Sequence, residues 1–183
     1  TMIIKELALQ GKHNIFNSMA AAMAARVFEV KDSVIRQSLI DFENLEHRLE
    51  HVITVNGVDY VNDSKATNVN ASWYALESMN SNVVWIAGGV DKGNDYSQLI
   101  QIAQKKVKAI ICLGENNEKI IKSFKGKVDT IISASNMKEA VNHSYNIAEK
   151  DDVVLLSPAC ASFDLFNNYE DRGLQFKQEV RKL

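Results

Sequence analysis

The stretch VVWIAGG, residues 83–89, begins with five apolar residues and ends in two glycines. Three other runs are also rich in Val, Ile or Leu without strict alternation, at 108–114 (KAIICLG), 128–134 (VDTIISA) and 152–158 (DVVLLSP). This pattern is typical of strands that are buried on both faces. The four runs therefore predict the central strands of a parallel sheet.

Helical patterns lie between these runs. Apolar residues recur at spacings of three and four over 96–107, 120–124 and 137–148. Strands that alternate with helices form βαβ units with right-handed crossovers. The predicted fold class is therefore α/β, a Rossmann-like and mostly parallel sheet flanked by helices.

A different pattern precedes the first of these strands. Within HVITVNGVDYVND (51–63), Asn56 and Gly57 separate two runs that contain apolar residues, which predicts a β-hairpin. The following segment NASWYALESM (70–79) has the apolar spacing of a helix. We expect the hairpin to add a pair of strands at the start of the sheet.

Residues 1–46 do not continue this alternation. IIKELAL (3–9) is a candidate strand, and SVIRQSLIDF (33–42) is a candidate helix. NIFNSMAAAMAARVFEV (14–30) is a second candidate helix, apolar nearly all round, so we expect it to be buried on several sides. These elements do not make a domain, and we place the domain boundary near NLEHRLE (44–50).

Composition excludes several classes of protein. The 183 residues are 46% hydrophobic and 24% charged, with a formal net charge of −2, which is typical of a globular chain. Scattered basic residues argue against a nucleic-acid or anionic membrane surface, and no apolar run reaches the length of a membrane span. The start TMIIKELALQ does not resemble a secretory signal. Cys112 and Cys160 stand in no metal-binding spacing, so we expect buried, reduced thiols in a cytoplasmic protein.

Polar residues gather where three of the predicted strands end. NDSKATN (62–68), GGVDKGND (88–95) and SPACASFDLFNNYEDRG (157–173) each follow a strand. Ligands bind beyond the carboxyl ends of strands in open parallel sheets, so we expect the three loops to converge on one crevice. Lysines, hydroxyl groups and helix N-termini there suit an anionic ligand. The candidate residues are Asp63, Ser64, Lys65, Thr67, Lys92, Ser157, Ser162 and Tyr169.

Each of these residues also has a structural interpretation. Thr67 or Asn68 could cap a helix, and any single loop lysine is usually solvated. GGVDKG differs from the dinucleotide fingerprint GxGxxG, and GxxxxGK[ST] does not occur in the chain. Cys160 or Ser162 would need a base nearby to act as a nucleophile, and all four histidines lie outside the three loops.

Several motifs together resemble one family. GKHNIFN (11–17), EHRLE (46–50), NGVDYVNDSKATN (56–68), GGVDKGNDY (88–96) and SPACASFDLFNNYEDRGLQF (157–176) are similar to the Mur ligase family, and within it to the D-glutamate-adding ligases (MurD). The resemblance covers nearly the whole chain. It implies that residues 1–46 are the tail of a central ATPase domain, a helical remnant, and that residues 47–183 are the C-terminal, amino-acid-binding domain.

The resemblance also implies a reaction. ATP phosphorylates the alanine carboxylate of UDP-MurNAc-L-alanine, and the amine of D-glutamate then attacks the acyl phosphate. In this resemblance Thr67 and Lys92 hold the α-carboxylate of D-glutamate. Ser162, with Phe163 and Tyr169, holds the side-chain carboxylate. The resemblance therefore predicts a D-glutamate site shared by three loops.

The nucleotide side follows from the same resemblance. His47 would lie at the hinge between the domains. ATP and Mg²⁺ would serve the complete enzyme, whose P-loop, magnesium ligands and UDP pocket lie upstream, so this chain alone is expected to be inactive and to hold no metal. The implied nucleotide-binding residues are Asn14, Asn17, Arg48, Asp63 and Lys65.

A second hypothesis comes from a different class of protein. The chain could be a stand-alone Rossmann-like module that binds a small acid or a nucleotide. Catalytic machinery encoded upstream would favour the ligase, and an unrelated upstream partner would favour the module. A Rossmann dehydrogenase is a third interpretation, which the missing glycine fingerprint argues against.

Overall fold

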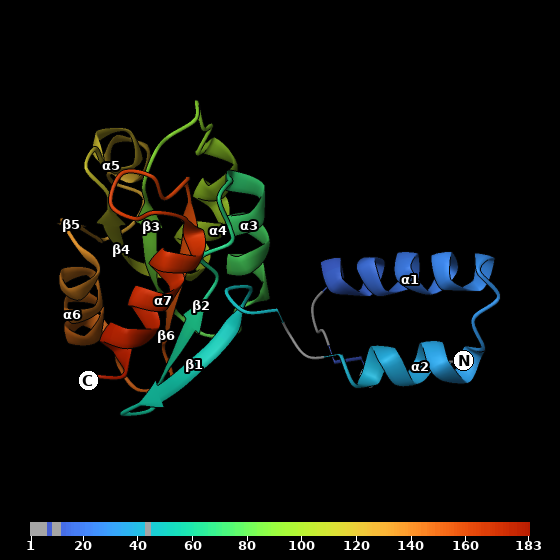
Figure 1. Ribbon diagram of the computed structural model, residues 1–183. Coiled ribbons are helices and arrows are strands. Elements are labelled where there is room, and N and C mark those ends of the chain that lie inside the picture. The colour runs from blue at the N-terminus through green and yellow to red at the C-terminus, as the bar shows by residue number, and fades with distance from the viewer. Residues whose placement is uncertain (1–6, 9–11, 43–44) are drawn as a thin grey trace. The chain divides into compact units, whose positions relative to one another are not determined.

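The computed structural model describes residues 7–8, 12–42 and 45–183 (Figure 1). The chain divides into two compact units, Thr1–Leu45 and Glu46–Leu183. The division falls inside the segment 44–50, where the composition changes. Each unit is described by itself.

The described residues of the first unit form two helices, α1 (Lys12–Val27) and α2 (Asp32–Ile40). Arg26 Nε and Nη2 donate to the two carboxylate oxygens of Asp32 at 3.0 and 2.9 Å, which links the end of α1 to the start of α2. Both helices were predicted from the sequence. The strand predicted at 3–9 falls mainly on 3–6 and 9, which lie outside the described residues.

The apolar side chains of α1 are open in this chain, although the composition of the helix suits burial on several sides. Phe16 is 70% exposed, Met23 is 63% exposed and Val27 is 80% exposed. Phe28, just after the helix, is 81% exposed. A two-helix unit has too few elements to cover every side of an apolar helix. These side chains therefore form an uncovered apolar surface.

The second unit is a six-stranded sheet with strand order β1-β2-β6-β3-β4-β5. β1 pairs antiparallel with β2, and all other neighbours are parallel. The strands are β1 (Glu50–Val55), β2 (Val58–Asn62), β3 (Val83–Gly88), β4 (Val107–Leu113), β5 (Thr130–Ala134) and β6 (Val153–Ala159). The helices are α3 (Val69–Ser78), α4 (Ser97–Lys106), α5 (Glu118–Phe124), α6 (Met137–Ile147) and α7 (Tyr169–Val180).

The hairpin between β1 and β2 confirms its turn signal. Val55 pairs with Val58, so Asn56 and Gly57 are the only turn residues. Their φ angles are 52° and 80°, the left-handed region that a two-residue hairpin of this kind requires. Asparagine and glycine adopt this region more readily than other residues.

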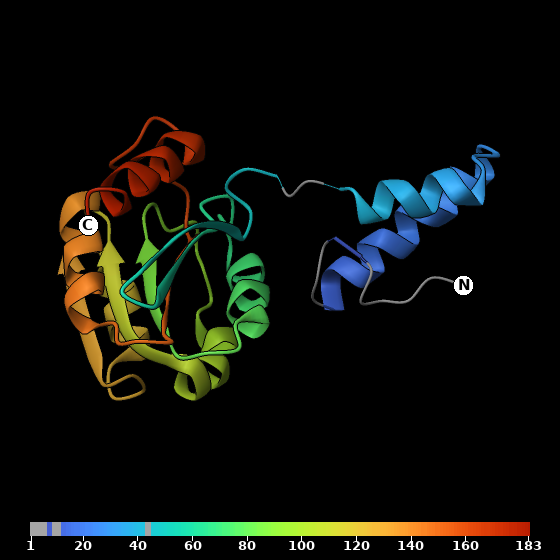
Figure 2. The same ribbon diagram turned by 90° about the horizontal axis from the view of Figure 1, so that it is seen from below.

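The sheet is buried on both faces, as its continuous apolar strands predicted. Trp85 and Leu155 point to one apolar cluster, whereas their neighbours Ile86 and Leu156 point to the other. α3, α4 and α5 cover the first face, and α6 and α7 cover the second. Figure 2 shows the sheet between α6 and α7, in orange and red, and α3 and α4, in green and yellow-green.

β6 is the last strand in the chain, but it lies between β2 and β3. The helices that follow β2 and β3 pack on one face of the sheet, whereas α7, which follows β6, packs on the other. The chain therefore leaves β6 toward the opposite face of the sheet from both neighbouring strands. Such a switch point leaves a crevice at the carboxyl edge, where open α/β sheets bind their ligands.

α7 is a helix that the sequence analysis did not predict. The residues from Ser157 onward were treated as one long loop, but the loop ends at Asn168, whose side chain accepts a hydrogen bond from the Asp171 amide. Asparagine at this position is a helix N-cap. Asn168 is the second of two adjacent asparagines in a polar stretch, which conceals the start of the helix.

Candidate functional site at the carboxyl edge of the sheet

Backbone hydrogen bonds join the three polar loops, as predicted. The Ala159 amide donates to Ala66 O at 2.9 Å, which links the loop after β2 to the end of β6. The Val90 amide donates to Ala161 O at 2.9 Å, and the Ala161 amide donates back to Val90 O at 3.3 Å. The loop after β6 therefore lies between the loops after β2 and β3.

Gly89 allows this close approach. Its φ is 122°, and a Cβ at this position would lie 2.2 Å from Ala161 O. Both the backbone angle and the space exclude any side chain. Gly89 thus serves the contact between two loops, and no phosphate-cradling motif is needed to explain it.

Thr67, Lys92 and Ser162 each lie within two residues of these loop contacts. Ser162 is 2% exposed, and Lys92 is exposed. Neither the Ser162 hydroxyl nor the Lys92 ammonium has a hydrogen-bond partner within the described ranges. Asn68 caps α3 by accepting from the Ala71 amide at 2.9 Å, so the cap role belongs to Asn68 and leaves the half-buried Thr67 side chain at the crevice.

Asp91 shapes the loop that carries Lys92. Its Oδ1 accepts from the amides of Gly93 at 2.7 Å and Asn94 at 3.0 Å, and from Lys119 Nζ at 2.9 Å. Burial raises the pKa of Asp91, but these hydrogen bonds outweigh it and hold the pKa below its ordinary value. These hydrogen bonds of Asp91 therefore hold the turn directly before Lys92.

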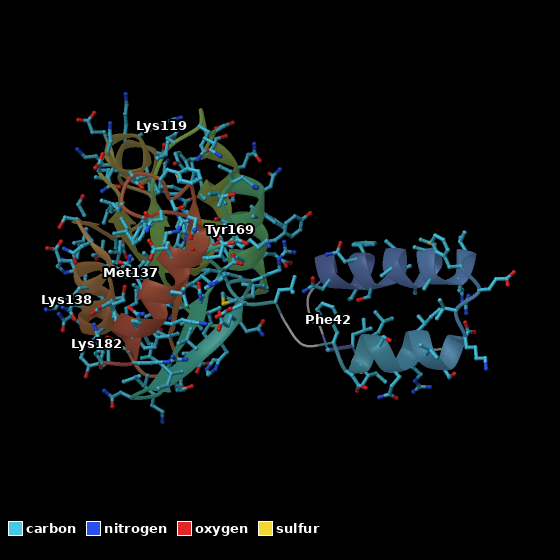
Figure 3. All side chains as sticks on the ribbon, in the orientation of Figure 1. Phe42, Lys119, Met137, Lys138, Tyr169 and Lys182 are labelled. Carbon is cyan, nitrogen blue, oxygen red and sulfur yellow. The ribbon has the colours of Figure 1, made fainter. Side chains whose placement is uncertain are left out.

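Tyr169 begins α7 beside the loop after β2, and Figure 3 labels it. Lys65 Nζ lies 5.3 Å from the centre of its ring and donates to its hydroxyl at 3.3 Å. This geometry is a cation–π contact with an added hydrogen bond. Phe163 is 70% exposed, so its ring is free to cover a bound ligand.

Asp63 is buried, although NDSKATN is a loop motif. It is 6% exposed, Oδ1 accepts from the Leu49 amide at 3.2 Å, and Oδ2 accepts from Ser157 Oγ at 2.9 Å. Burial raises the pKa of Asp63 to about 7, against the opposing effects of these hydrogen bonds and of Arg48. The carboxyl group holds the segment before β1 against β6. A ribose contact would require one of these bonds to open.

His47 lies in the segment 46–50 that was predicted to be a hinge. It is 4% exposed with φ 64°, and its Nδ1 lies 3.0 Å from Asn62 Nδ2. The His47 amide donates to Glu50 Oε2 at 2.9 Å, and its carbonyl accepts from the Lys65 amide at 3.1 Å. A positive φ in a non-glycine residue persists only where its surroundings hold it. The start of the segment 46–50 is therefore held by contacts of His47 with Asn62 and Lys65 of NDSKATN.

The predicted nucleotide residues divide between the two units. Asn14 and Asn17 are on α1 of the first unit, half-buried and exposed respectively. Arg48 and Lys65 are exposed in the second unit, where Asp63 is buried. The second unit therefore supplies two exposed cations, Arg48 and Lys65. The two residues predicted for the adenine side belong to the first unit.

Arg172 is a site residue that the sequence analysis missed. It is 1% exposed and bonds to both Ser64 and the Cys160 carbonyl. Its position four residues before Phe176 places both on one helix face, and Phe176 is in the core. The spacing of four residues between Arg172 and the core residue Phe176 is the sequence signal for a buried Arg172. The signal is easily missed because arginines are mostly exposed.

Among the described residues, no helix combines the length and the apolar character needed to cross a membrane. The described residues also contain no group of three or more His, Cys, Asp or Glu side chains that could hold a metal ion.

Cys112 and Cys160 are free and buried, as predicted. Burial raises the pKa of each thiol, which is the opposite of an activated nucleophile.

The fold and the junction of the three loops define a class: an open, mostly parallel α/β domain whose switch point carries a hydroxyl and an ammonium group with no partner among the described residues. Comparison with known protein families identifies one family within this class. Residues 47–160 match the family described as Mur ligase, glutamate ligase domain, and the chain belongs to this family.

Curated relatives agree with this assignment. The chain is 58% identical over its full length to a UDP-N-acetylmuramoylalanine–D-glutamate ligase of Christiangramia forsetii, of which it covers 41%. It is 56% identical over 97% of its length to the ligase of the same name from Porphyromonas gingivalis, of which it covers 39%. The chain thus spans about two fifths of these relatives and matches their C-terminal part.

Solved structures share the fold at low sequence identity. A UDP-N-acetylmuramate–alanine ligase (MurC) of Thermotoga maritima matches 96% of the chain with a TM-score of 0.68 and 14% identity, over 39% of its own length. A MurF ligase of the same organism, solved with ADP, matches 94% of the chain with a TM-score of 0.67 and 16% identity, over 40% of its length.

Proposed function

We propose that this chain is the C-terminal part of an ATP-dependent ligase that adds D-glutamate to UDP-MurNAc-L-alanine in peptidoglycan precursor synthesis. Its own task is to hold D-glutamate. The observation that carries the proposal is the junction of three loops, which leaves the Ser162 hydroxyl and the Lys92 ammonium without partners among the described residues. The identity of 58% to a ligase of this name supports it.

The chemistry of the crevice fits a dicarboxylate with a free amine. Lys92 and Thr67 would bind the α-carboxylate, because an ammonium and a hydroxyl both donate to carboxylate oxygens. Ser162 would bind the side-chain carboxylate, with Phe163 and Tyr169 covering it. When both carboxylates of the substrate are held, its amine points in one fixed direction. Such positioning is what an amine needs to attack an acyl phosphate efficiently.

The nucleotide would contact the other side of the loop after β2. Lys65 and Arg48 are exposed cations whose chemistry suits phosphate oxygens. Asn14 and Asn17, in the first unit, would contribute on the adenine side. Magnesium would be held by the upstream part of the central domain. The ligase would work in the cytoplasm, where ATP is available.

We further propose that residues 1–46 belong to the central ATPase domain and residues 47–183 to the amino-acid-binding domain. Relatives more than twice as long as this chain support a preceding part, and the exposed apolar surface of α1 is suited to pack against it. Closure of the two domains would then exclude water from the acyl phosphate.

Amide NMR of the 183-residue chain tests the binding site. Titration with D-glutamate should shift the signals of 63–68, 88–94 and 160–163, and L-glutamate should shift them much less. Ser162→Ala should weaken the response. Equal responses to both enantiomers, or shifts confined to other segments, would overturn the proposed site.

A ligase assay tests the division of labour. With ATP, D-glutamate and UDP-MurNAc-L-alanine, the 183-residue chain should form no product, and the complete protein should form the amide. Product from the purified 183-residue chain above the blank would contradict the proposed need for the central domain.

A further inference from the structure

Arg172 joins two of the three loops from beneath the crevice. Its Nε donates to Ser64 Oγ at 3.0 Å, and its Nη2 donates to Ser64 O at 2.8 Å. Its Nη1 donates to Cys160 O at 3.2 Å. One planar group therefore binds the loop after β2 through two atoms and the loop after β6 through a third.

A second contact completes the connection. Ser64 Oγ donates to Tyr169 O at 2.7 Å, so the loop after β2 is also attached to the first residue of α7. Ser64 is 0% exposed and Arg172 is 1% exposed, so water does not compete for these bonds. The spacing between the two loops is set by short, dry contacts.

The charge of Arg172 is not part of an ion pair among the described residues, although the Asp164 carboxylate attracts it. No acidic side chain among the described residues forms an ion pair with it, and its hydrogen bonds go to carbonyl and hydroxyl oxygens. Burial lowers its pKa to about 10, against the attraction of Cys160 and Asp164, so it remains a cation at neutral pH. A buried cation of this kind favours an anion in the adjoining crevice.

The attached atoms lie next to the proposed ligand contacts. Ser64 is three residues before Thr67, and Cys160 is two residues before Ser162. Thr67 and Ser162 are proposed to hold opposite ends of D-glutamate. Any change in the distance between the two loops would therefore change the length of dicarboxylate that fits.

We propose that Arg172 is a specificity-determining positioning residue, which sets the spacing between the two carboxylate-binding loops and so the length of the amino acid selected. It acts through Ser64 and Cys160 and does not touch the substrate. This inference rests on the proposed function, because it needs a dicarboxylate held between Thr67 and Ser162.

A lysine cannot replace the guanidinium here. The planar fork of arginine directs its donors to several fixed acceptors at once, whereas an ammonium on a flexible stem does not. Arg172→Lys keeps the charge and loses the geometry. Arg172→Met loses both and keeps the apolar stem. Phe176→Leu, one helical turn further along α7, is the matched control, because Phe176 is fully buried but contacts neither loop through hydrogen bonds.

The first test measures selectivity. Binding of D-glutamate and of D-aspartate, which is one methylene shorter, is compared in the 183-residue chain by NMR titration. One methylene is discriminated by roughly 10- to 200-fold in a fitted site, so Arg172→Lys should reduce the preference for D-glutamate by about tenfold. Phe176→Leu should leave the preference unchanged, because a loss of stability weakens both ligands equally. An unchanged preference in both Arg172 variants would overturn the inference.

The second test needs no ligand. Hydrogen exchange should quicken at the Ala159 and Ala161 amides of Arg172→Lys, because these amides join the loops, with little change at Ile110 in β4. Equal loss of protection at all three would make Arg172 a general stabilising residue and would contradict the inference. If the wild-type chain bound no D-glutamate, the proposed function would fail in this chain, and the exchange result would still decide whether Arg172 sets the loop spacing.

Discussion

The Ser157 hydroxyl donates a hydrogen bond of 2.9 Å to Asp63 Oδ2, across the boundary between β6 and β2. Both residues are buried, and the second oxygen of Asp63 accepts from the Leu49 amide. A carboxyl group from the polar loop after β2 is thus a structural link between the segment before β1 and β6. Its ionisation should affect stability as well as ligand binding.

Stability should fall as the pH rises toward neutrality because of Asp63. Burial raises its pKa from 3.8 to about 7, so the folded state holds the proton more tightly than the unfolded state. The stabilising contribution is complete below about pH 4 and is lost as the pH rises through about 7, with a slope of at most about tenfold in the folding equilibrium per pH unit. Urea unfolding of wild type and Asp63→Asn between pH 4 and 8 measures this difference.

Asp129→Asn removes an exposed carboxylate and is the control. Its unfolding free energy should follow that of the wild type over the same range. A constant difference between wild type and Asp63→Asn from pH 4 to pH 8 would show that Asp63 does not titrate in this window.

Lys92→Ala should raise the KM for D-glutamate in the complete ligase much more than the KM for ATP. A charge-assisted hydrogen bond contributes roughly 1.5–3 kcal/mol, which corresponds to a loss on the order of ten- to a hundredfold. Lys92→Arg should not restore it fully, because a planar fork does not replace a compact ammonium. Steady-state kinetics with each substrate varied in turn provide the measurement.

Lys105→Ala, an exposed lysine in the last turn of α4 at the opposite edge of the sheet, is the control and should leave both KM values unchanged. Small and equal effects of Lys92→Ala on ATP and D-glutamate would leave Lys92 a solvated surface residue.

Gly173→Ala should destabilise the domain although alanine favours helices over glycine by about 1 kcal/mol. A Cβ at residue 173 would lie 2.2 Å from His47 Nδ1, in a buried contact. Overpacking of this kind costs roughly 1–3 kcal/mol. Thermal unfolding of the single variants and of Gly173→Ala combined with His47→Ala forms a double-mutant cycle. The double variant should recover part of the loss, and strict additivity would refute the proposed clash.

The apolar surface of α1 should make the 183-residue chain self-associate. Phe16, Met23 and Phe28 are more than 60% exposed, and contiguous apolar surface of this kind promotes association. Phe16→Lys combined with Met23→Lys should shift the chain toward monomer in sedimentation velocity experiments. Tyr145→Ser, which removes a side chain that is 40% exposed on α6, should not. A strictly monomeric wild-type chain at high concentration would be evidence against this prediction.

Local patterns in the sequence predicted much of the fold. The apolar run at 83–89 indicated a doubly buried strand because a parallel strand buries both faces, and Asn56-Gly57 indicated a hairpin because few residues adopt positive φ. The polar loops after three strands predicted the convergence now seen between Ala66, Val90 and the segment after β6. Their detailed ligand roles stay predictions.

The sequence by itself thus determined most of the strands and helices, α7 excepted, and which loops carry polar chemistry, since burial and backbone angles are recorded in neighbouring residues. Only the tertiary structure placed β6 between β2 and β3, buried Asp63 against Ser157, and set Arg172 between Ser64 and Cys160. Strand order depends on long-range pairing, and the partner of a buried polar group lies far away in the chain. In the sequence Asp63 and Arg172 both stand in predicted loops, and their burial arises only when the distant segments pack together.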